Sequence, residues 1–265
     1  HDMTILKHTL FFFLLVAQIC FAQWFWQNPL PQGNDLNDVD FIDEFNGIAV
    51  GKSGTIIHTT DGGINWTIQE SGTTNNLNGV CFTDESTGYA VGELGIILKT
   101  QDGGITWAIQ QYGLEYDLTD VCFVDANTGW IVNGWLSITD TTNIILHTTD
   151  GGINWVQQTY SLLWGEGLLS VYFLDANIGY AAGYYGSVFK TTDGGENWQF
   201  KLGMTGSSVI TDIHFIDINK GWVVQHRQDL PFLNKDGSAG FSEEGQIIHT
   251  VDGGNTWTVQ MDTLN

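Results

Sequence analysis

Residues 58–66 read HTTDGGINW, and close copies of this string recur further along the chain. An Asp in this setting hydrogen-bonds its own following backbone, and the Gly-Gly pair supplies the positive φ angles that a tight, bulged hairpin requires. The tryptophan that closes the string can bury a large ring face against a sheet. The five copies end at Trp66, Trp107, Trp155, Trp198 and Trp257.

A second string lies upstream of each copy. It reads VDFIDEFNGIAVG from Val39 and VCFTDESTGYAVG from Val80, and its later copies begin at Val121, Val171 and Ile213. Apolar and polar residues alternate between turn signals, which predicts four strands per unit: a (Val-x-Phe), b (Gly-Tyr/Trp-x-Val), c (Ile-Ile-His-Thr) and d, after the Trp. Four strands in about 40–45 residues are typical of a propeller blade. We therefore predict an all-β fold, a β-propeller with five blade repeats, because no stretch is long enough for the helices of a solenoid.

Several polar residues recur once per unit, so whole blades separate them and they cannot converge on one catalytic or metal site. We assign the aspartates to turns, the tryptophans to packing within the blades, and the strand-c residues to packing or ion pairs. The structural Asp-box residues are Asp61, Trp66, Asp102, Trp107, Asp150, Trp155, Asp193, Trp198, Asp252 and Trp257; the a–b turn carries Asp43, Asp84, Asp125, Asp175 and Asp217; strand c carries His58, Lys99, His147, Lys190 and His249.

The five strings resemble Asp-box (BNR) repeats. Their coupling to the second string resembles the photosystem II stability/assembly factor-like propeller family, and the resemblance covers essentially the whole chain after residue 22. It implies a propeller fold. Asp-boxes also occur in sialidases, xyloglucanases and sorting receptors, and the plant and cyanobacterial members of the family are assembly chaperones that bind a membrane-protein precursor through a basic surface.

The charge of the chain argues against several functions. Thirty Asp and Glu residues stand against eight Lys and Arg, and the net charge of −22 disfavours nucleic-acid and anionic-membrane partners. Arg227 is the single arginine, whereas a sialidase clamps its substrate carboxylate with three. A xyloglucanase-type site needs two carboxylates across a cleft between two propellers, and this chain is long enough for one. We lean against catalysis and expect neither a cofactor nor a bound metal.

The N-terminal segment has the pattern of a secretory signal peptide. Lys7 precedes an apolar run over 10–17, and small residues at Cys20 and Ala22 precede a cleavage position. We predict a signal peptide over residues 1–22, with two extra residues before Met3, and a propeller domain over 23–265. The protein is then secreted, periplasmic or at the cell surface, with no integral membrane span in the mature chain.

The ends of the repeat array predict a larger parent. Residues 26–33 align with the strand-d stretch 66–72, yet the last unit already has its own strand d after Trp257. We therefore expect about seven blades in the parent protein, with closure by five blades as the alternative.

Cys81 and Cys122 occupy the same position of successive repeats. Such positions are usually too far apart for a disulfide, so we predict two buried free thiols.

Departures from the repeat concentrate in the b–c and d–a connections, which share one face of a propeller. Loops on a rigid scaffold commonly carry binding sites, and aromatic side chains beside carboxylates suit sugar rings or an extended peptide. The alternative is that these aromatics cover blade edges. The candidate ligand-binding residues are Tyr112, Glu115, Tyr116, Asp117, Trp135, Tyr160, Trp164, Glu166, His226 and Arg227.

Three functions are compatible with this sequence. The leading hypothesis is a secreted or cell-surface binding scaffold for an unidentified protein or glycan, with the oligomeric state open. The second is a glycoside hydrolase-like enzyme whose acids lie among Glu115, Asp117, Glu166 and Glu243. The third is a structural adhesin or stalk segment.

Overall fold

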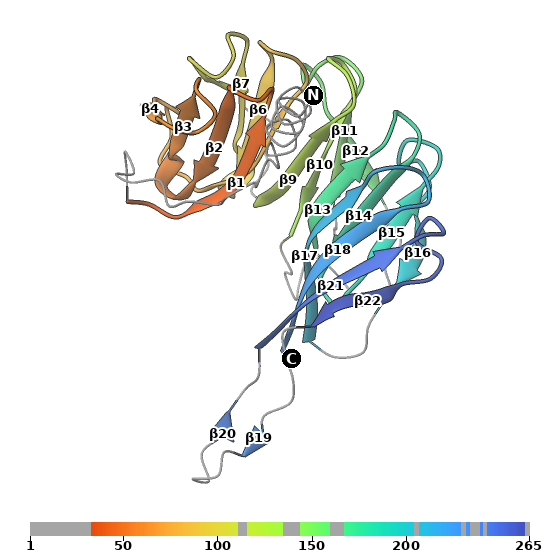
Figure 1. The fold of residues 1–265 in the computed structure, drawn as a ribbon. Coiled ribbons are helices and arrows are strands. Elements are labelled where there is room, and N and C mark those ends of the chain that lie inside the picture. Colours follow the sequence, from red (N-terminus) through yellow and green to blue (C-terminus); the bar gives the residue numbers. More distant parts are fainter. Residues whose placement is uncertain are drawn as a thin grey trace, which may run out of the picture. The chain divides into compact units, whose positions relative to one another are not determined.

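The chain folds into antiparallel sheets (Figure 1). Five sheets have four strands each in chain order, so every predicted repeat forms one blade. The first strand of each blade contacts the first strand of the next blade, which makes these strands the innermost ones. The prediction of an all-β, five-bladed propeller is confirmed. The computed structural model describes residues 33–110, 116–134, 144–159, 167–203, 207–228, 232–233, 239–240 and 243–262.

The first three blades follow the predicted pattern, and strand b is buried along its whole length in each of them. Short 3-10 turns follow strand b in blades 1 and 2. Blade 1 comprises β1 (Leu36–Phe41), β2 (Gly47–Gly51), η1 (Lys52–Gly54), β3 (Ile56–Thr59) and β4 (Thr67–Gln69); blade 2 comprises β5 (Leu77–Phe82), β6 (Gly88–Gly92), η2 (Glu93–Gly95), β7 (Ile97–Thr100) and β8 (Ala108–Gln110); blade 3 comprises β9 (Leu118–Phe123), β10 (Gly129–Asn133), β11 (Ile144–Thr148) and β12 (Val156–Thr159).

The fifth blade differs from the sequence prediction. The strand-b pattern ends at Val224, but paired strands continue until Gln228 faces Glu243. The buried amides of Gln225 and Gln246 hydrogen-bond each other at 2.5 Å, which holds the extended strands together. Blade 4 comprises β13 (Leu168–Phe173), β14 (Gly179–Gly183), β15 (Val188–Thr191) and β16 (Gln199–Leu202); blade 5 comprises β17 (Ser207–Phe215), β18 (Gly221–Gln228), β21 (Glu243–Thr250) and β22 (Thr258–Asp262), with the hairpin β19 (Phe232–Leu233) and β20 (Ala239–Gly240) in its b–c connection.

Strand b of each blade contributes to two cores, because successive side chains point to opposite faces of a sheet. In blade 2, Ala90 packs toward blade 1, whereas Tyr89 and Val91 pack toward blade 3. An aromatic ring of strand b stacks on the strand-a Phe of the next blade. The ring-centroid distances are 4.0 Å for Tyr89–Phe123, 3.5 Å for Trp130–Phe173 and 3.6 Å for Tyr180–Phe215.

The same blade boundaries are tied by hydrogen bonds. The Tyr89 hydroxyl and the Lys99 ammonium of blade 2 both donate to the carbonyl of Gly151 in blade 3, each at 2.7 Å. Lys190 of blade 4 donates to Gly253 of blade 5 at 3.2 Å. The two strand-c lysines thus reach the next blade's Asp-box turn rather than forming ion pairs.

The Asp-box turn closes the c–d hairpin through local hydrogen bonds. In blade 1, Asp61 accepts bonds from the Thr59 hydroxyl (2.9 Å) and from the backbone N–H of Asn65 (2.8 Å). The Thr59 hydroxyl accepts in turn from the Gly63 N–H at 2.8 Å. Gly62 and Gly63 have φ angles of 70° and 83°, which explains the Gly-Gly pair. The bonds from Asn65 lower the pKa of Asp61.

Each Asp-box tryptophan meets the strand-a phenylalanine of its own blade edge-on. In blade 1, Trp66 and Phe41 lie 6.2 Å apart at an interplanar angle of 85°. The equivalent pairs are Phe82–Trp107, Phe123–Trp155, Phe173–Trp198 and Phe215–Trp257.

The cysteines are free, as predicted, although they are half-buried rather than fully buried. The Cys81 sulfur accepts the backbone N–H of Phe123 at 3.3 Å, and the Cys122 sulfur accepts that of Phe173 at 3.4 Å. Each thiol therefore touches the innermost strand of the next blade.

Two predictions about the chain ends remain predictions. The signal-peptide segment lies outside the described residues, and the number of blades in the parent protein concerns more than this chain. No helix within the described ranges has the length and apolar character needed to cross a membrane.

Candidate binding face

The b–c turns of blades 1, 2 and 4 each place one side chain at the end of the propeller. Ser53, Leu94 and Tyr185 occupy equivalent positions and have φ angles of 55°, 55° and 57°, in the left-handed region that non-glycine residues rarely adopt. Leu94 is 65% exposed and Tyr185 is 44% exposed. These turns present large side chains to solvent from a defined backbone.

The next d–a connection braces two of these turns. The Ser53 N–H donates to the Asn76 side-chain oxygen at 2.8 Å, and the Leu94 N–H donates to Asp117 at 2.9 Å. Asn76 also donates from its amide to Glu93 at 2.7 Å. Each brace joins one blade to the next, so the face is built as a rigid surface.

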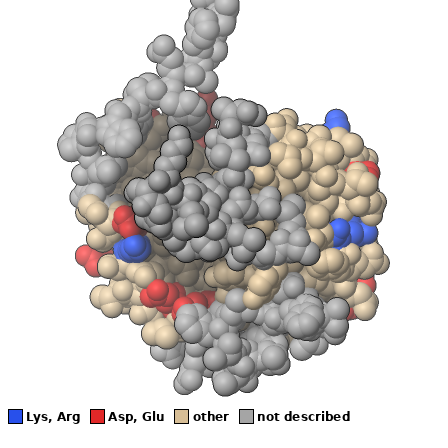
Figure 2. All heavy atoms as spheres, turned by 90° about the horizontal axis from the view of Figure 1, so that it is seen from below, with Lys and Arg blue, Asp and Glu red and all other residues tan. Residues whose placement is uncertain are grey.

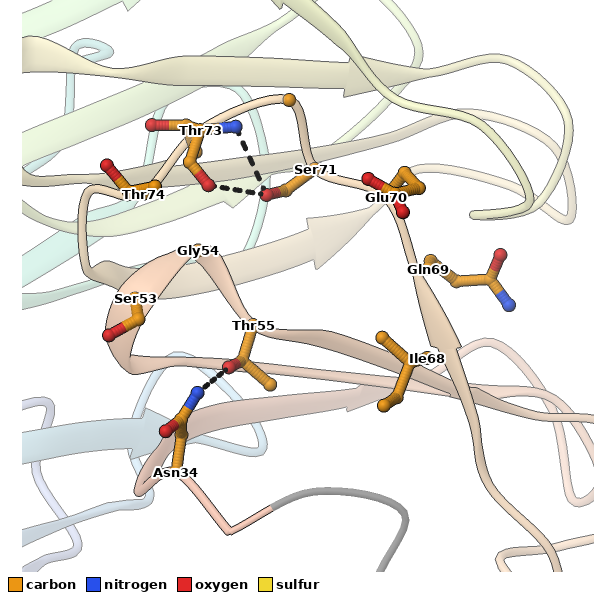
Figure 3. Close-up of a pocket in the computed structure, with 11 residues that line it drawn as sticks. Asn34, Ser53, Gly54, Thr55, Ile68, Gln69, Glu70, Ser71, Thr73 and Thr74 are labelled. Atoms are coloured by element: carbon orange, nitrogen blue, oxygen red, sulfur yellow. Dashed lines mark hydrogen bonds between the residues drawn. The ribbon is translucent and has the colours of Figure 1, made fainter.

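A pocket of about 610 Å³ opens beside the b–c turn of blade 1, and we call it the blade-1 pocket (Figure 3). Asn34 donates to the Thr55 hydroxyl at 2.8 Å on one wall, and the Ser71 hydroxyl donates to the Thr73 carbonyl at 3.1 Å on another. Gly54 lets the turn approach the Thr73 carbonyl so closely that a Cβ atom would collide with it. The pocket is lined by Asn34, 53–55 and 68–74.

Comparison with known proteins assigns the family. The sequence profile of the photosynthesis system II assembly factor YCF48 matches residues 65–199, more than half of the 265 residues. The chain belongs to the YCF48 family. A search of curated proteins gave no match.

Solved structures share the fold of this YCF48-family chain. YCF48 bound to D1 peptide is 20% identical with a TM-score of 0.58, over 87% of this chain and 82% of that chain. YCF48 from Cyanidioschyzon merolae is 19% identical with a TM-score of 0.59, over 89% and 87%. The GH74 enzyme of Niastella koreensis is 17% identical with a TM-score of 0.65, over 85% of this chain and 38% of that chain.

Acidic side chains of the b–c turns and d–a connections of this YCF48-family member include Glu70, Glu93 and Asp117. Toward the edge of the view in Figure 2, both acidic (red) and basic (blue) side chains are visible. Lys52, in the b–c turn of blade 1, pairs with Asp35 at 2.5 Å. The hydrogen bond from Lys52 lowers the pKa of Asp35 and raises that of Lys52. Glu70, Glu93 and Asp117 have no basic partner among the described side chains.

A second acidic layer lies on the innermost strands. Asp38, Asp120 and Asp212 occupy the same strand-a position of blades 1, 3 and 5. Burial raises the pKa of Asp38, and the charges of Asp40 and Asp212 raise it further. Among the described residues, no group of three or more His, Cys, Asp or Glu could hold a metal ion. Because their oxygens accept backbone N–H groups, Asp38 and Asp120 link neighbouring blades.

The structure gives local roles to two of the predicted ligand-binding residues. Tyr116 packs against the core between blades 2 and 3, and Asp117 holds the Leu94 turn. His226 is half-buried in β18, and only the backbone of Arg227 is described. Ligand binding by these residues remains a prediction. Tyr112, Glu115, Trp135, Tyr160, Trp164 and Glu166 lie outside the described residues, as does the Glu243 side chain.

Sequence reasoning missed the exposed turn residues Leu94 and Tyr185. A signal was available, because Gly92-Glu93-Leu94-Gly95 and Gly183-Tyr184-Tyr185-Gly186 place a glycine directly after the turn's central residue. Such spacing favours a tight turn with a left-handed second half.

Proposed function

We propose that this YCF48-family propeller is a non-catalytic scaffold that holds an extended segment of a client protein on its b–c/d–a face. The observation that carries the proposal is the shared fold with YCF48 bound to D1 peptide. Rigid turns that expose Leu94 and Tyr185 suit this function, since preorganised surfaces lose little entropy on binding.

We further propose that the protein acts outside the cytoplasm. The support is the apolar run over 10–17, followed by small residues at Cys20 and Ala22. Expression of the full chain with N-terminal sequencing of the exported product tests this. A mature N-terminus at Gln23 supports it, and an uncleaved cytoplasmic product contradicts it.

The binding proposal is tested with a peptide array and a glycan array probed by the purified chain. Leu94→Asn and Tyr185→Asn remove exposed side chains from the proposed face, and Asn tolerates the left-handed backbone of these turns. Ile64→Asn and Ile153→Asn are matched controls, because these residues are 69% and 76% exposed in Asp-box turns on the opposite face. We expect peptide binding to weaken in the first pair alone. Equal loss in both pairs would contradict the choice of face.

The same assay tests the enzymatic alternative. The fold shared with the Niastella koreensis GH74 enzyme motivates an examination of the glycan array for cleavage products. Turnover of any glycan would overturn the non-catalytic proposal. Binding of glycans without turnover, and no binding of peptides, would replace the client protein with a carbohydrate ligand.

A further inference from the structure

We propose that the client segment is cationic and that it places an arginine or lysine side chain in the blade-1 pocket, against Glu70. This inference rests on the proposed function and names the chemistry of its ligand.

The pocket combines an apolar wall with a carboxylate. Ile68 is 57% exposed in β4, and Glu70 follows it by two residues. Both residues line the pocket, Ile68 from β4 and Glu70 from directly after its end. In Figure 3 the Ile68 side chain points toward the side where Thr55 lies, while Gln69 projects away. Arginine and lysine match this arrangement, because their aliphatic stems cover apolar surface while the charged head meets a carboxylate.

The Thr55 and Ser71 hydroxyls of the pocket are already engaged in hydrogen bonds. The Thr55 hydroxyl accepts from Asn34 and donates to the Lys52 carbonyl at 2.7 Å. The Ser71 hydroxyl donates to the Thr73 carbonyl and accepts the Thr73 N–H at 3.3 Å. Among the described residues, Glu70 has neither a hydrogen-bond donor nor a basic partner. The pocket therefore offers a ligand an unpaired acceptor with a negative charge.

The lining favours a peptide side chain over a sugar ring. Sugar rings commonly stack on aromatic faces, and none of the described residues that line the pocket is aromatic. Threonine, serine and isoleucine side chains line it instead.

The charge of the whole chain acts in the same direction. A net charge of −22 attracts cationic segments and repels acidic ones over distances of about a Debye length. Lys52, next to the pocket residue Ser53, is already paired with Asp35. The expected ligand is therefore cationic, whereas a basic surface would bind an anionic one.

The test uses short labelled peptides of one length and one Gly/Ser/Thr background that differ in a central Arg, Lys, Gln or Glu. Fluorescence anisotropy gives their affinities for the full chain. We expect the Arg peptide to bind roughly two- to fivefold more tightly than the Gln peptide, and the Glu peptide to bind most weakly. Added salt should reduce the advantage of the Arg peptide.

Glu70→Gln should abolish most of the advantage of the Arg peptide over the Gln peptide. The control is Glu44→Gln, which removes an exposed acid from the a–b turn of the same blade and should leave this advantage unchanged. Ile68→Ser should weaken both peptides more than Ile109→Ser, which alters the equivalent strand-d residue of blade 2. Thermal unfolding checks that all four variants are folded.

The outcomes separate this inference from the proposed function. If peptides of mixed sequence on the array bind but the Arg peptide has no advantage, the cationic ligand is wrong and the scaffold function stands. If the Arg peptide has an advantage that Glu70→Gln leaves intact, the placement of the basic side chain against Glu70 is wrong and the scaffold function again stands. If no peptide binds the chain at all, both proposals fail.

Discussion

The Oδ2 oxygen of Asp120 in blade 3 accepts a hydrogen bond of 2.8 Å from the backbone N–H of Val171 in blade 4. Asp38 does the same for Val80 across the boundary between blades 1 and 2, also at 2.8 Å. A strand-a carboxylate thus accepts a hydrogen bond from a backbone N–H in the innermost strand of the next blade. These two strands belong to different sheets, so no backbone ladder joins them. Enclosure of the carboxyl raises the pKa of Asp120 to about 8, and the charge of Asp38 adds to the shift.

This pKa predicts a stability that decreases with pH. The folded state holds the Asp120 proton more tightly than the unfolded chain does. The contribution of Asp120 to the free energy of unfolding is therefore complete below a pH of about 3.9 and is lost as the pH rises through about 8. We expect the Tm of the wild-type chain to fall by about 2–6 °C relative to Asp120→Asn between about pH 5 and 8.5.

The difference between the two proteins reports on Asp120 together with its interaction with Asp38. Burial lowers the pKa of His58 and His147, so these histidines stabilise the fold more as the pH rises. This effect is the same in both proteins and cancels in the comparison. Parallel pH profiles of Tm for wild type and variant would show that Asp120 does not hold its proton in this range.

The Asp-box threonine predicts a measurable stability loss. Thr148 is 1% exposed, and its hydroxyl donates to Asp150 and accepts the Gly152 N–H, both at 2.9 Å. Thr148→Val keeps the shape and leaves a buried N–H without an acceptor, which should cost about 1–3 kcal/mol of unfolding free energy in urea titrations. Thr149→Val, at the exposed neighbour, should change it by less than about 0.5 kcal/mol. Equal effects would mean that the turn does not depend on the hydroxyl.

The stacked tryptophan of blade 3 should contribute more than its counterpart in blade 5. Trp130 is 0% exposed, stacks on Phe173 and donates to the Gly194 carbonyl at 3.0 Å. We expect Trp130→Phe to cost about 1–3 kcal/mol, mainly through lost packing, because Gln158 also donates to that carbonyl. Trp222 is half-buried, and Trp222→Phe should cost less than about 1 kcal/mol. Urea unfolding of both variants measures these two losses of unfolding free energy. A larger loss for Trp222→Phe than for Trp130→Phe would contradict the packing argument.

The cysteines should react slowly in the folded protein. Burial raises the pKa of Cys122 to about 12 and also raises that of Cys81, so little thiolate exists near neutral pH. We expect modification by a thiol reagent at about pH 8 to be at least about 100-fold slower in the native chain than in urea. Ser53→Cys places a thiol on an exposed turn and should react quickly. Fast labelling of the native wild-type chain would show that the thiols are accessible.

The sequence by itself determined the blades and their hairpins. The Asp61 turn depends on Thr59, Gly63 and Asn65, all within a few residues, so its hydrogen bonds are dictated by the local string. The alternation along each strand likewise assigns its two faces without knowledge of the neighbours. For this reason the number of blade repeats, their strand order and the absence of a disulfide were predictable.

Only the tertiary structure decided which of the variable residues face a ligand. Asp117 was a candidate ligand contact, yet it holds Leu94, which precedes it by 23 residues in another blade. Tyr116 was a candidate too, and it packs into a core. The blade-1 pocket joins a turn, a strand end and the connection to the next blade. Contacts of this kind depend on how closely neighbouring blades approach, and that distance is set by side-chain packing between sheets rather than by any local pattern.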